Sequence, residues 1–334
     1  MKRIINLGLR LWLGLFLTSF LTLASFCSAQ TYVSIPDPFF AKYLQTIVPS
    51  AMSTGQLNTG SPAVLTLTAM TVNNKNIANL TGIQYFTSLT WLSCYGNQLT
   101  SLPILPPLLT HLWCGNNAIT TFSGLPNSLD YLQCSYNQLS ALPDSLPDLL
   151  YLSCSNNMLG SLPALPNTLT SLECSNNTIS SLPALPPYLQ KLLCDYNQLS
   201  KLPVLPGTLR YLLCQNNKLR VLPKLPDSLQ TLYCSNNYLL ALPALPKYLQ
   251  VLTCNKNALA ALPALPDSMQ ALNCSFNNIT EYADFPVRMT FIDIANNPFT
   301  CLPNYIRAMG DDTLNYPKCA GVNKDGYPII RNRK

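Results

Sequence analysis

The sequence predicts an α/β-type repeat fold that is mostly β and extended: a solenoid with a parallel sheet on its concave face and an extended, proline-rich convex side. Cysteine recurs every 20 residues through most of the chain, and asparagine follows each of these cysteines three positions later. A single short period of this kind indicates stacked structural repeats. The 334 residues include 28 prolines but only 13 glycines, and 48% are hydrophobic, which excludes disordered and collagen-like chains.

Residues 1–29 are typical of a signal peptide for export. Basic residues precede a largely apolar run over residues 11–26, and small residues occupy the positions that a signal peptidase recognises before Gln30. Two alternatives are less favoured. An uncleaved membrane anchor needs about 20 apolar residues, and a lipidated Cys27 would follow the bulky Phe26. We therefore expect a protein that is secreted or displayed at the cell surface.

Residues 30–69 are expected to form an N-terminal cap and loop. Asp37 and Pro38 are typical of a helix start, and apolar residues then follow at helical spacing until Pro49. Residues 50–62 are rich in serine, threonine, glycine and asparagine, so this segment predicts a loop.

Residues 70–297 are expected to form the solenoid. The repeating unit reads L-x-x-L-x-C-x-x-N-x-L-x-x-L-P-x-L-P, as between Leu169 and Pro186, which is the leucine-rich repeat pattern at its shortest period. A first, atypical coil begins at Met70, and its step to the next coil is 22 residues. Each unit predicts a short strand that buries leucine and cysteine, followed by a return segment that its prolines hold extended. No single coil can bury its apolar side chains alone, so the coils must stack.

The repeated asparagine is expected to turn the chain after each strand. Its amide can bond backbone groups that the turn would otherwise leave buried and unpaired. This predicted structural ladder consists of Asn97, Asn117, Asn137, Asn157, Asn177, Asn197, Asn217, Asn237, Asn257 and Asn277, and Asn297 extends it.

The ten cysteines of the repeat, from Cys94 to Cys274, are expected in the core as small hydrophobic residues. Adjacent strands lie about 4.8 Å apart, so their Cβ atoms are farther apart than the roughly 3.8 Å that a disulfide prefers. Zinc needs ligands that converge as a tetrahedron, whereas these thiols form a line. We therefore expect neither disulfides nor metal within the ladder.

Residues 298–334 are expected to form a C-terminal cap and tail, with a helical turn ending at Gly310. Cys301 and Cys319 lie outside the ladder, where a segment with little core would gain most from a cross-link. We expect a disulfide between them, which by loop entropy would contribute about 3 kcal/mol.

The consecutive L-P-x-L-P units resemble the short-repeat bacterial class of leucine-rich repeat, best known from type III secretion effectors of enteric pathogens. The cap and the coil from Ile77 to Ile83 resemble secreted, internalin-related repeat proteins of Bacteroidetes-type bacteria. The resemblance covers about residues 35–320 and implies a leucine-rich repeat solenoid. Some of these effectors carry a ubiquitin ligase whose nucleophilic cysteine lies in a Cys-x-Asp motif, and this chain has no such motif.

Outward-facing strand positions on the concave face are rich in aromatic residues. Tryptophan and tyrosine are the residue types that most often anchor protein interfaces, and they also stack on sugar rings. As an alternative, single tyrosines simply suit exposed sheet positions. The predicted ligand-binding residues are Trp91, Tyr95, His111, Trp113, Tyr131, Tyr151, Tyr211 and Tyr233.

The sequence therefore predicts a binding module that recognises a protein partner, on a host or cell surface, through the concave face. The alternatives are a carbohydrate-binding protein that uses a platform from Trp91 to Tyr131, a purely structural envelope protein and, less favoured, a divergent effector ubiquitin ligase. We expect no enzymatic activity, cofactor or metal, because His111 is the only histidine. Signal cleavage would remove three basic residues from a net charge of +6, and no basic cluster occurs before residues 331–334, which argues against nucleic acid as a partner. No membrane span is expected after signal cleavage.

Overall fold

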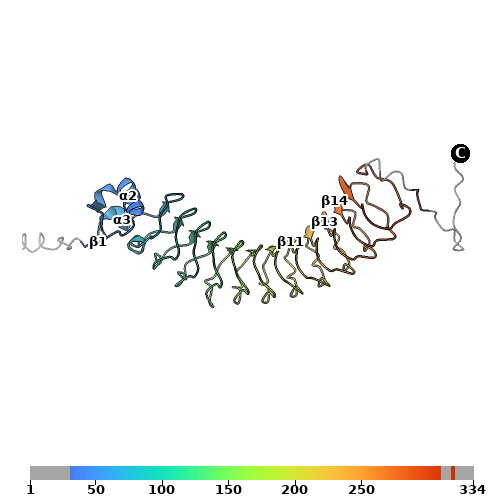
Figure 1. The fold of residues 1–334 in the computed structure, drawn as a ribbon, viewed down its shortest axis with the longest axis horizontal. Coiled ribbons are helices and arrows are strands. Elements are labelled where there is room, and N and C mark those ends of the chain that lie inside the picture. The colour runs from blue at the N-terminus through green and yellow to red at the C-terminus, as the bar shows by residue number, and fades with distance from the viewer. Residues whose placement is uncertain (1–30, 310–316, 320–334) are drawn as a thin grey trace, which may run out of the picture.

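The computed structural model describes residues 31–309 and 317–319. The chain forms an open arc of stacked coils, and each coil contributes one short strand to a parallel sheet on the inner side of the arc (Figure 1). The predicted leucine-rich repeat solenoid is confirmed. The predicted signal peptide at residues 1–29 and the tail beyond Cys319 lie outside the described residues.

The N-terminal cap is a three-stranded antiparallel sheet in the order β1–β3–β2, packed with short helices. The prediction of a loop over residues 50–62 is wrong, because this segment contains two strands. Thr54 and Gly55 both have positive φ, 46° and 77°, and this turn geometry matches the twist of a tight hairpin. The cap elements are β1 (Tyr32–Ser34), α2 (Pro38–Ile47), η1 (Pro49–Ala51), β2 (Met52–Ser53), β3 (Gln56–Asn58) and α3 (Pro62–Leu65).

Helix α2 begins where the sequence predicts. Asp37 caps this helix and also bonds the first coil of the solenoid. Its Oδ1 accepts hydrogen bonds from the backbone N–H groups of Phe39 and Phe40, at 2.9 and 3.0 Å. Its Oδ2 accepts from Ala78 and Asn79 of the first coil, at 2.7 and 3.0 Å. This buried carboxylate therefore joins the cap to the solenoid.

The main sheet has twelve parallel strands in chain order. Neighbouring strands pair in register at an offset of 20 residues, and only the first step, from Ala69 to Trp91, is longer. A 3₁₀ turn, η2 (Ile83–Tyr85), fills out that first coil. The strands are β4 (Ala69–Thr71), β5 (Trp91–Ser93), β6 (His111–Trp113), β7 (Tyr131–Gln133), β8 (Tyr151–Ser153), β9 (Ser171–Glu173), β10 (Lys191–Leu193), β11 (Tyr211–Leu213), β12 (Thr231–Tyr233), β13 (Val251–Thr253), β14 (Ala271–Asn273) and β15 (Phe291–Asp293).

Leucine and cysteine side chains fill the interior of the coils. The ladder cysteines are fully buried with free thiols, as at Cys114 and Cys134, whose Sγ atoms donate to backbone carbonyls of the next coil. Burial raises the pKa of Cys94 to about 12, so at neutral pH the thiol is protonated and packs as a small apolar group.

Each ladder asparagine bonds two coils at once. The Nδ2 group of Asn177 donates to the carbonyl oxygens of Cys174 in its own coil and Cys154 in the preceding coil, both at 3.1 Å. Its Oδ1 accepts from the backbone N–H of Leu159 at 3.0 Å. The asparagine thus satisfies backbone groups that stacking removes from water.

The residue two positions after each ladder cysteine has a left-handed backbone. Asparagine and glycine tolerate this conformation, and most coils use one of them. The exceptions carry large side chains and are Tyr136, Tyr196, Lys256 and Phe276, with φ between 50° and 58°.

The C-terminal end closes with the expected disulfide, Cys301–Cys319, whose Cα atoms lie 4.9 Å apart. A single hydrogen-bonded turn, in which the Met309 N–H donates to the Ile306 carbonyl at 3.1 Å, lies where the helical turn is expected, and Gly310 itself lies outside the described residues. Asn304 bonds both the N–H and the carbonyl of Phe285, at 2.8 and 2.9 Å. These bonds hold the segment against the last coil, and Leu302 forms a parallel bridge with Lys318.

Candidate functional site

Four rings stack along the concave face at its N-terminal end. Trp91, His111, Tyr131 and Tyr151 occupy the same register on strands β5 to β8. The successive centroid distances are 5.0, 5.4 and 4.2 Å, and the interplanar angles are 24°, 11° and 6°. Stacking follows from the repeat, because in-register side chains lie about one strand spacing, roughly 4.8 Å, apart.

Trp113 lies beside this stack. It comes from the other outward position of β6, and its ring centroid is 5.4 Å from that of Trp91 and 5.9 Å from that of Tyr131. Its Nε1 atom is buried and makes no hydrogen bond within the described residues. We refer to Trp91, His111, Trp113, Tyr131 and Tyr151 as the aromatic row.

The aromatic row is not a flat platform. His111 lies between the rings of Trp91 and Tyr131, and Tyr131 lies between those of His111 and Tyr151, so neighbours occupy both faces of the inner rings. Trp91 is an end ring, whose neighbour in register on the outer side is the small, exposed Ala69. The rings therefore form a ribbed surface rather than an open face.

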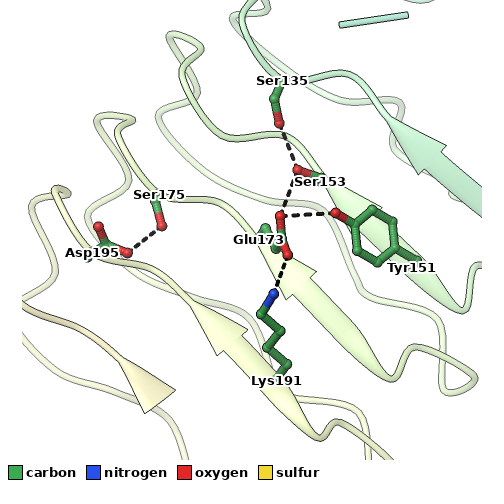
Figure 2. A network of polar contacts seen from close by, with 7 residues as sticks. All are labelled: Ser135, Tyr151, Ser153, Glu173, Ser175, Lys191 and Asp195. Atoms are coloured by element: carbon green, nitrogen blue, oxygen red, sulfur yellow. Dashed lines mark hydrogen bonds and ion pairs between the residues drawn. The ribbon is translucent and has the colours of Figure 1, made fainter. Parts of the chain in front are cut away.

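A polar network continues from the last ring (Figure 2). The Glu173 carboxylate accepts from the Tyr151 hydroxyl at 3.0 Å and from the Ser153 hydroxyl at 3.1 Å, and it pairs with Lys191 at 2.6 Å. Burial is the main cause that raises the pKa of Tyr151, so its hydroxyl stays protonated and donates at neutral pH. Ser135 extends the network through a 2.7 Å contact with Ser153. The end of the aromatic row is thereby fixed in place.

His111 has polar contacts as well as ring contacts. Its Nδ1 lies 2.9 Å from the Thr110 hydroxyl and 3.6 Å from Asp130 Oδ1. No group of three or more histidine, cysteine, aspartate or glutamate residues suited to a metal occurs within residues 31–309 and 317–319. Nor is any helix in this part of the chain long and apolar enough to cross a membrane.

The other predicted contact residues lie apart from the aromatic row. Tyr95 is exposed just after β5, and Tyr211 and Tyr233 lie on β11 and β12. None of the three makes a ring contact within the described part of the chain. Leu213 pairs in register with Tyr233, which gives a second, less aromatic strip. The structure thus brings five of the eight predicted residues together.

Sequence reasoning missed Ser153, Glu173 and Lys191 as parts of this site. All three occupy outward positions of the repeat, and the opposite charges of Glu173 and Lys191 stand on adjacent coils. Opposite charges at neighbouring outward positions are the sequence feature that could have predicted this ion pair.

Comparisons with known proteins agree with the fold. A family model described as "Leucine Rich repeats (2 copies)" matches residues 87–127. No curated protein sequence matches the chain. Leucine-rich repeat solenoids typically mediate protein–protein interactions.

Several solved structures are similar. YopM from Yersinia enterocolitica is 36% identical over 66% of this chain and 53% of its own, with a TM-score of 0.60, so the chain spans about half of that protein. YopM from Yersinia pestis, a leucine-rich effector protein, is 28% identical over 75% of this chain and 85% of its own, with a TM-score of 0.57. The functional domain of InlJ from Listeria monocytogenes, which includes a cysteine ladder, shares the fold at 24% identity and a TM-score of 0.59, over 82% and 73% of the two chains.

Proposed function

We propose that this chain is a secreted or cell-surface binding module that recognises a protein partner through its concave face. The observation that carries the proposal is the aromatic row, in which five neighbouring side chains on four strands form one continuous ring surface. Export is supported by the signal-peptide pattern of residues 1–29.

The aromatic row suits binding because its side chains are ordered in advance. Trp91, His111 and Tyr131 are each half-buried against neighbouring rings. At the far end, Tyr151 is held by its hydrogen bond to Glu173. Few rotamers are therefore lost on association, which removes a cost of about 0.5–1.5 kcal/mol for each side chain that would otherwise be immobilised.

The buried indole N–H of Trp113 also supports a role in binding. An indole N–H that is buried without an acceptor lowers stability by about 1–3 kcal/mol. The described part of the chain offers no acceptor for Trp113 Nε1. A tryptophan at this position is therefore poorly explained by folding alone, and binding through its large ring accounts for it.

The ring geometry favours a protein over a glycan. A sugar stacks on an open ring face, whereas the inner faces of the row are occupied by other rings. The outer faces of the two end rings, Trp91 next to Ala69 and Tyr151 next to Ser171, are the positions that favour a single sugar contact. Carbohydrate binding is thus a second candidate, restricted to the ends of the aromatic row.

The test is binding of the purified chain to parallel arrays of extracellular proteins and glycans. We expect Trp91→Ala/Trp113→Ala to lower affinity for a protein ligand by at least about 30-fold, since central aromatic anchors contribute about 2 kcal/mol or more. The matched control is Tyr188→Ala/Tyr248→Ala, which removes two exposed aromatic rings from the return segments. Thermal melting of each variant verifies that the fold is retained.

The outcomes separate the candidates. Loss of protein binding in the tryptophan variant alone supports the proposal. A glycan signal that the single variant Trp91→Ala abolishes and the single variant Trp113→Ala leaves unchanged would support the carbohydrate alternative. Equal binding by wild type and both variants would contradict the concave site, and the absence of any ligand would favour a structural envelope role.

A further inference from the structure

A second surface lies on the side of the solenoid, away from the aromatic row. It is a groove of about 380 Å³ across the three coils that follow strands β11, β12 and β13. Strand β11 is three strands from β8, the last strand of the row, or about 14 Å along the solenoid. The residues that line the groove are Arg220, Asn237, Tyr238, Leu240, Lys256, Asn257 and Ala258.

Two large, exposed side chains line this groove. Tyr238 and Leu240 flank the buried Leu239, so both point outward, and they are 61% and 68% exposed. The coil that follows β10 has the polar residues Gln198 and Ser200 at the equivalent positions. Exposed tyrosine and leucine side chains two residues apart therefore depart from the repeat, and exposed apolar patches are typical of contact surfaces.

Two cations stand on either side of these apolar residues. Arg220 lies on the coil before Tyr238 and Lys256 on the coil after it, and both are exposed. Neither forms an ion pair within the described residues, unlike Lys191, which is neutralised by Glu173. No carboxylate is among the lining residues. The groove therefore attracts anionic groups.

Lys256 occupies the left-handed position of the repeat, with φ +55°, where the two preceding coils have Asn216 and Asn236. A long side chain is less favourable there than asparagine, as it also is at the next coil's Phe276. The Lys256 Nζ lies 6.0 Å from the ring centroid of Phe276, so its ammonium group stays at the surface beside the groove.

We propose that this groove binds an acidic peptide segment in which two carboxylates flank apolar side chains. Coils two apart are separated by about 10 Å along the solenoid. A peptide in the polyproline II conformation advances about 3.1 Å per residue and repeats its side-chain direction every third residue. Two acidic residues three positions apart therefore lie on one side of such a peptide, at about the axial separation of the coils that carry Arg220 and Lys256. The residues between them then lie over Tyr238 and Leu240, a contact that a sulfated saccharide does not make.

The test is fluorescence anisotropy of the full chain with a labelled peptide that has two glutamates three positions apart and two leucines between them. We expect Arg220→Glu/Lys256→Glu to weaken binding at least about tenfold. The matched control, Lys224→Glu/Arg288→Glu, changes the same residue types by the same charge at exposed positions outside the groove, and we expect less than a twofold effect. Leu240→Ser should weaken the peptide but not a sulfated oligosaccharide.

Lys256→Asn is a second variant whose result does not depend on charge reversal. It should raise the melting temperature, because asparagine adopts this backbone conformation more readily, yet weaken the peptide. Trp91→Ala/Trp113→Ala should leave peptide binding unchanged, since the groove is separate from the aromatic row.

Three results would overturn the proposal. One is equal loss of peptide binding in the groove variant and its matched control. Another is binding of a sulfated oligosaccharide that is as tight as the peptide and insensitive to Leu240→Ser. The last is no detectable peptide binding by a wild-type chain that melts cooperatively.

Discussion

Replacement of Asn217 by alanine is expected to lower the free energy of unfolding by about 2–4 kcal/mol. Asn217 is buried between two coils. Its Nδ2 donates to the carbonyls of Cys194 and Cys214, at 3.0 and 3.1 Å, and its Oδ1 accepts from the backbone N–H of Leu199 at 2.9 Å. With a longer contact to the Gln215 carbonyl at 3.3 Å, one side chain thus bonds four backbone groups.

The size of this loss of stability depends on which of the backbone groups keep another hydrogen bond when the Asn217 side chain is removed. The Cys194 carbonyl retains a bond from Asn197, and the Cys214 carbonyl retains one from Asn237. The Leu199 N–H has no second acceptor within the described residues. An orphaned buried N–H costs about 1–3 kcal/mol, and loss of one of two bonds at each carbonyl adds roughly 0.5 kcal/mol apiece.

The assay is urea unfolding followed by the fluorescence of Trp91 and Trp113, with the wild-type slope as a check on the extent of unfolding. Asn278→Ala is the matched control, because Asn278 is exposed on the same repeat surface and its side chain makes no bond within the described residues. We expect it to change stability by less than about 0.5 kcal/mol. Equal destabilisation by Asn217→Ala and Asn278→Ala would show that the bonds of Asn217 between coils do not stabilise the solenoid.

Two further predictions concern the core and the cap. A thiol reagent at pH 8 should modify none of the ladder cysteines in the folded chain and all of them in urea. Because burial raises the pKa of Cys94 to about 12, the unfolded chain ionises first, so stability should be constant below about pH 8.5 and fall as the pH rises toward 12. A melting temperature that does not change over this range would contradict the assignment. Asp37→Ala should cost about 2–4 kcal/mol, since it removes both a helix cap and the acceptor for Ala78 and Asn79. Hydrogen exchange at Ala78 should accelerate in this variant, and unchanged protection there would show that Asp37 does not join cap and coil.

The solenoid was predictable from the strict repeat, because stacking gives each position of the repeat the same environment in every coil. Cys174 and Asn177 have the same surroundings as Cys194 and Asn197, so the argument for one unit holds for all. Asp37 was recognisable as a helix start for a different reason, namely that capping is local in sequence.

The hairpin of the cap was not predictable in this way. Strands β2 and β3 are two and three residues long, too short to show alternation. They form because Leu57 is buried against the cap and pairs with Val33 and Met52, and these contacts are decided by the tertiary structure. The same holds for Asn304, whose bonds to Phe285 join residues 19 positions apart.

The aromatic row was likewise predictable only in part. The repeat register alone placed Trp91, His111 and Tyr131 on one face, since alternate strand residues share a side of the sheet. The register did not predict that these rings cover one another's faces or that the Tyr151 hydroxyl donates to Glu173. These features depend on the side-chain rotamers of residues about 20 positions apart, which pack together only after the coils have stacked.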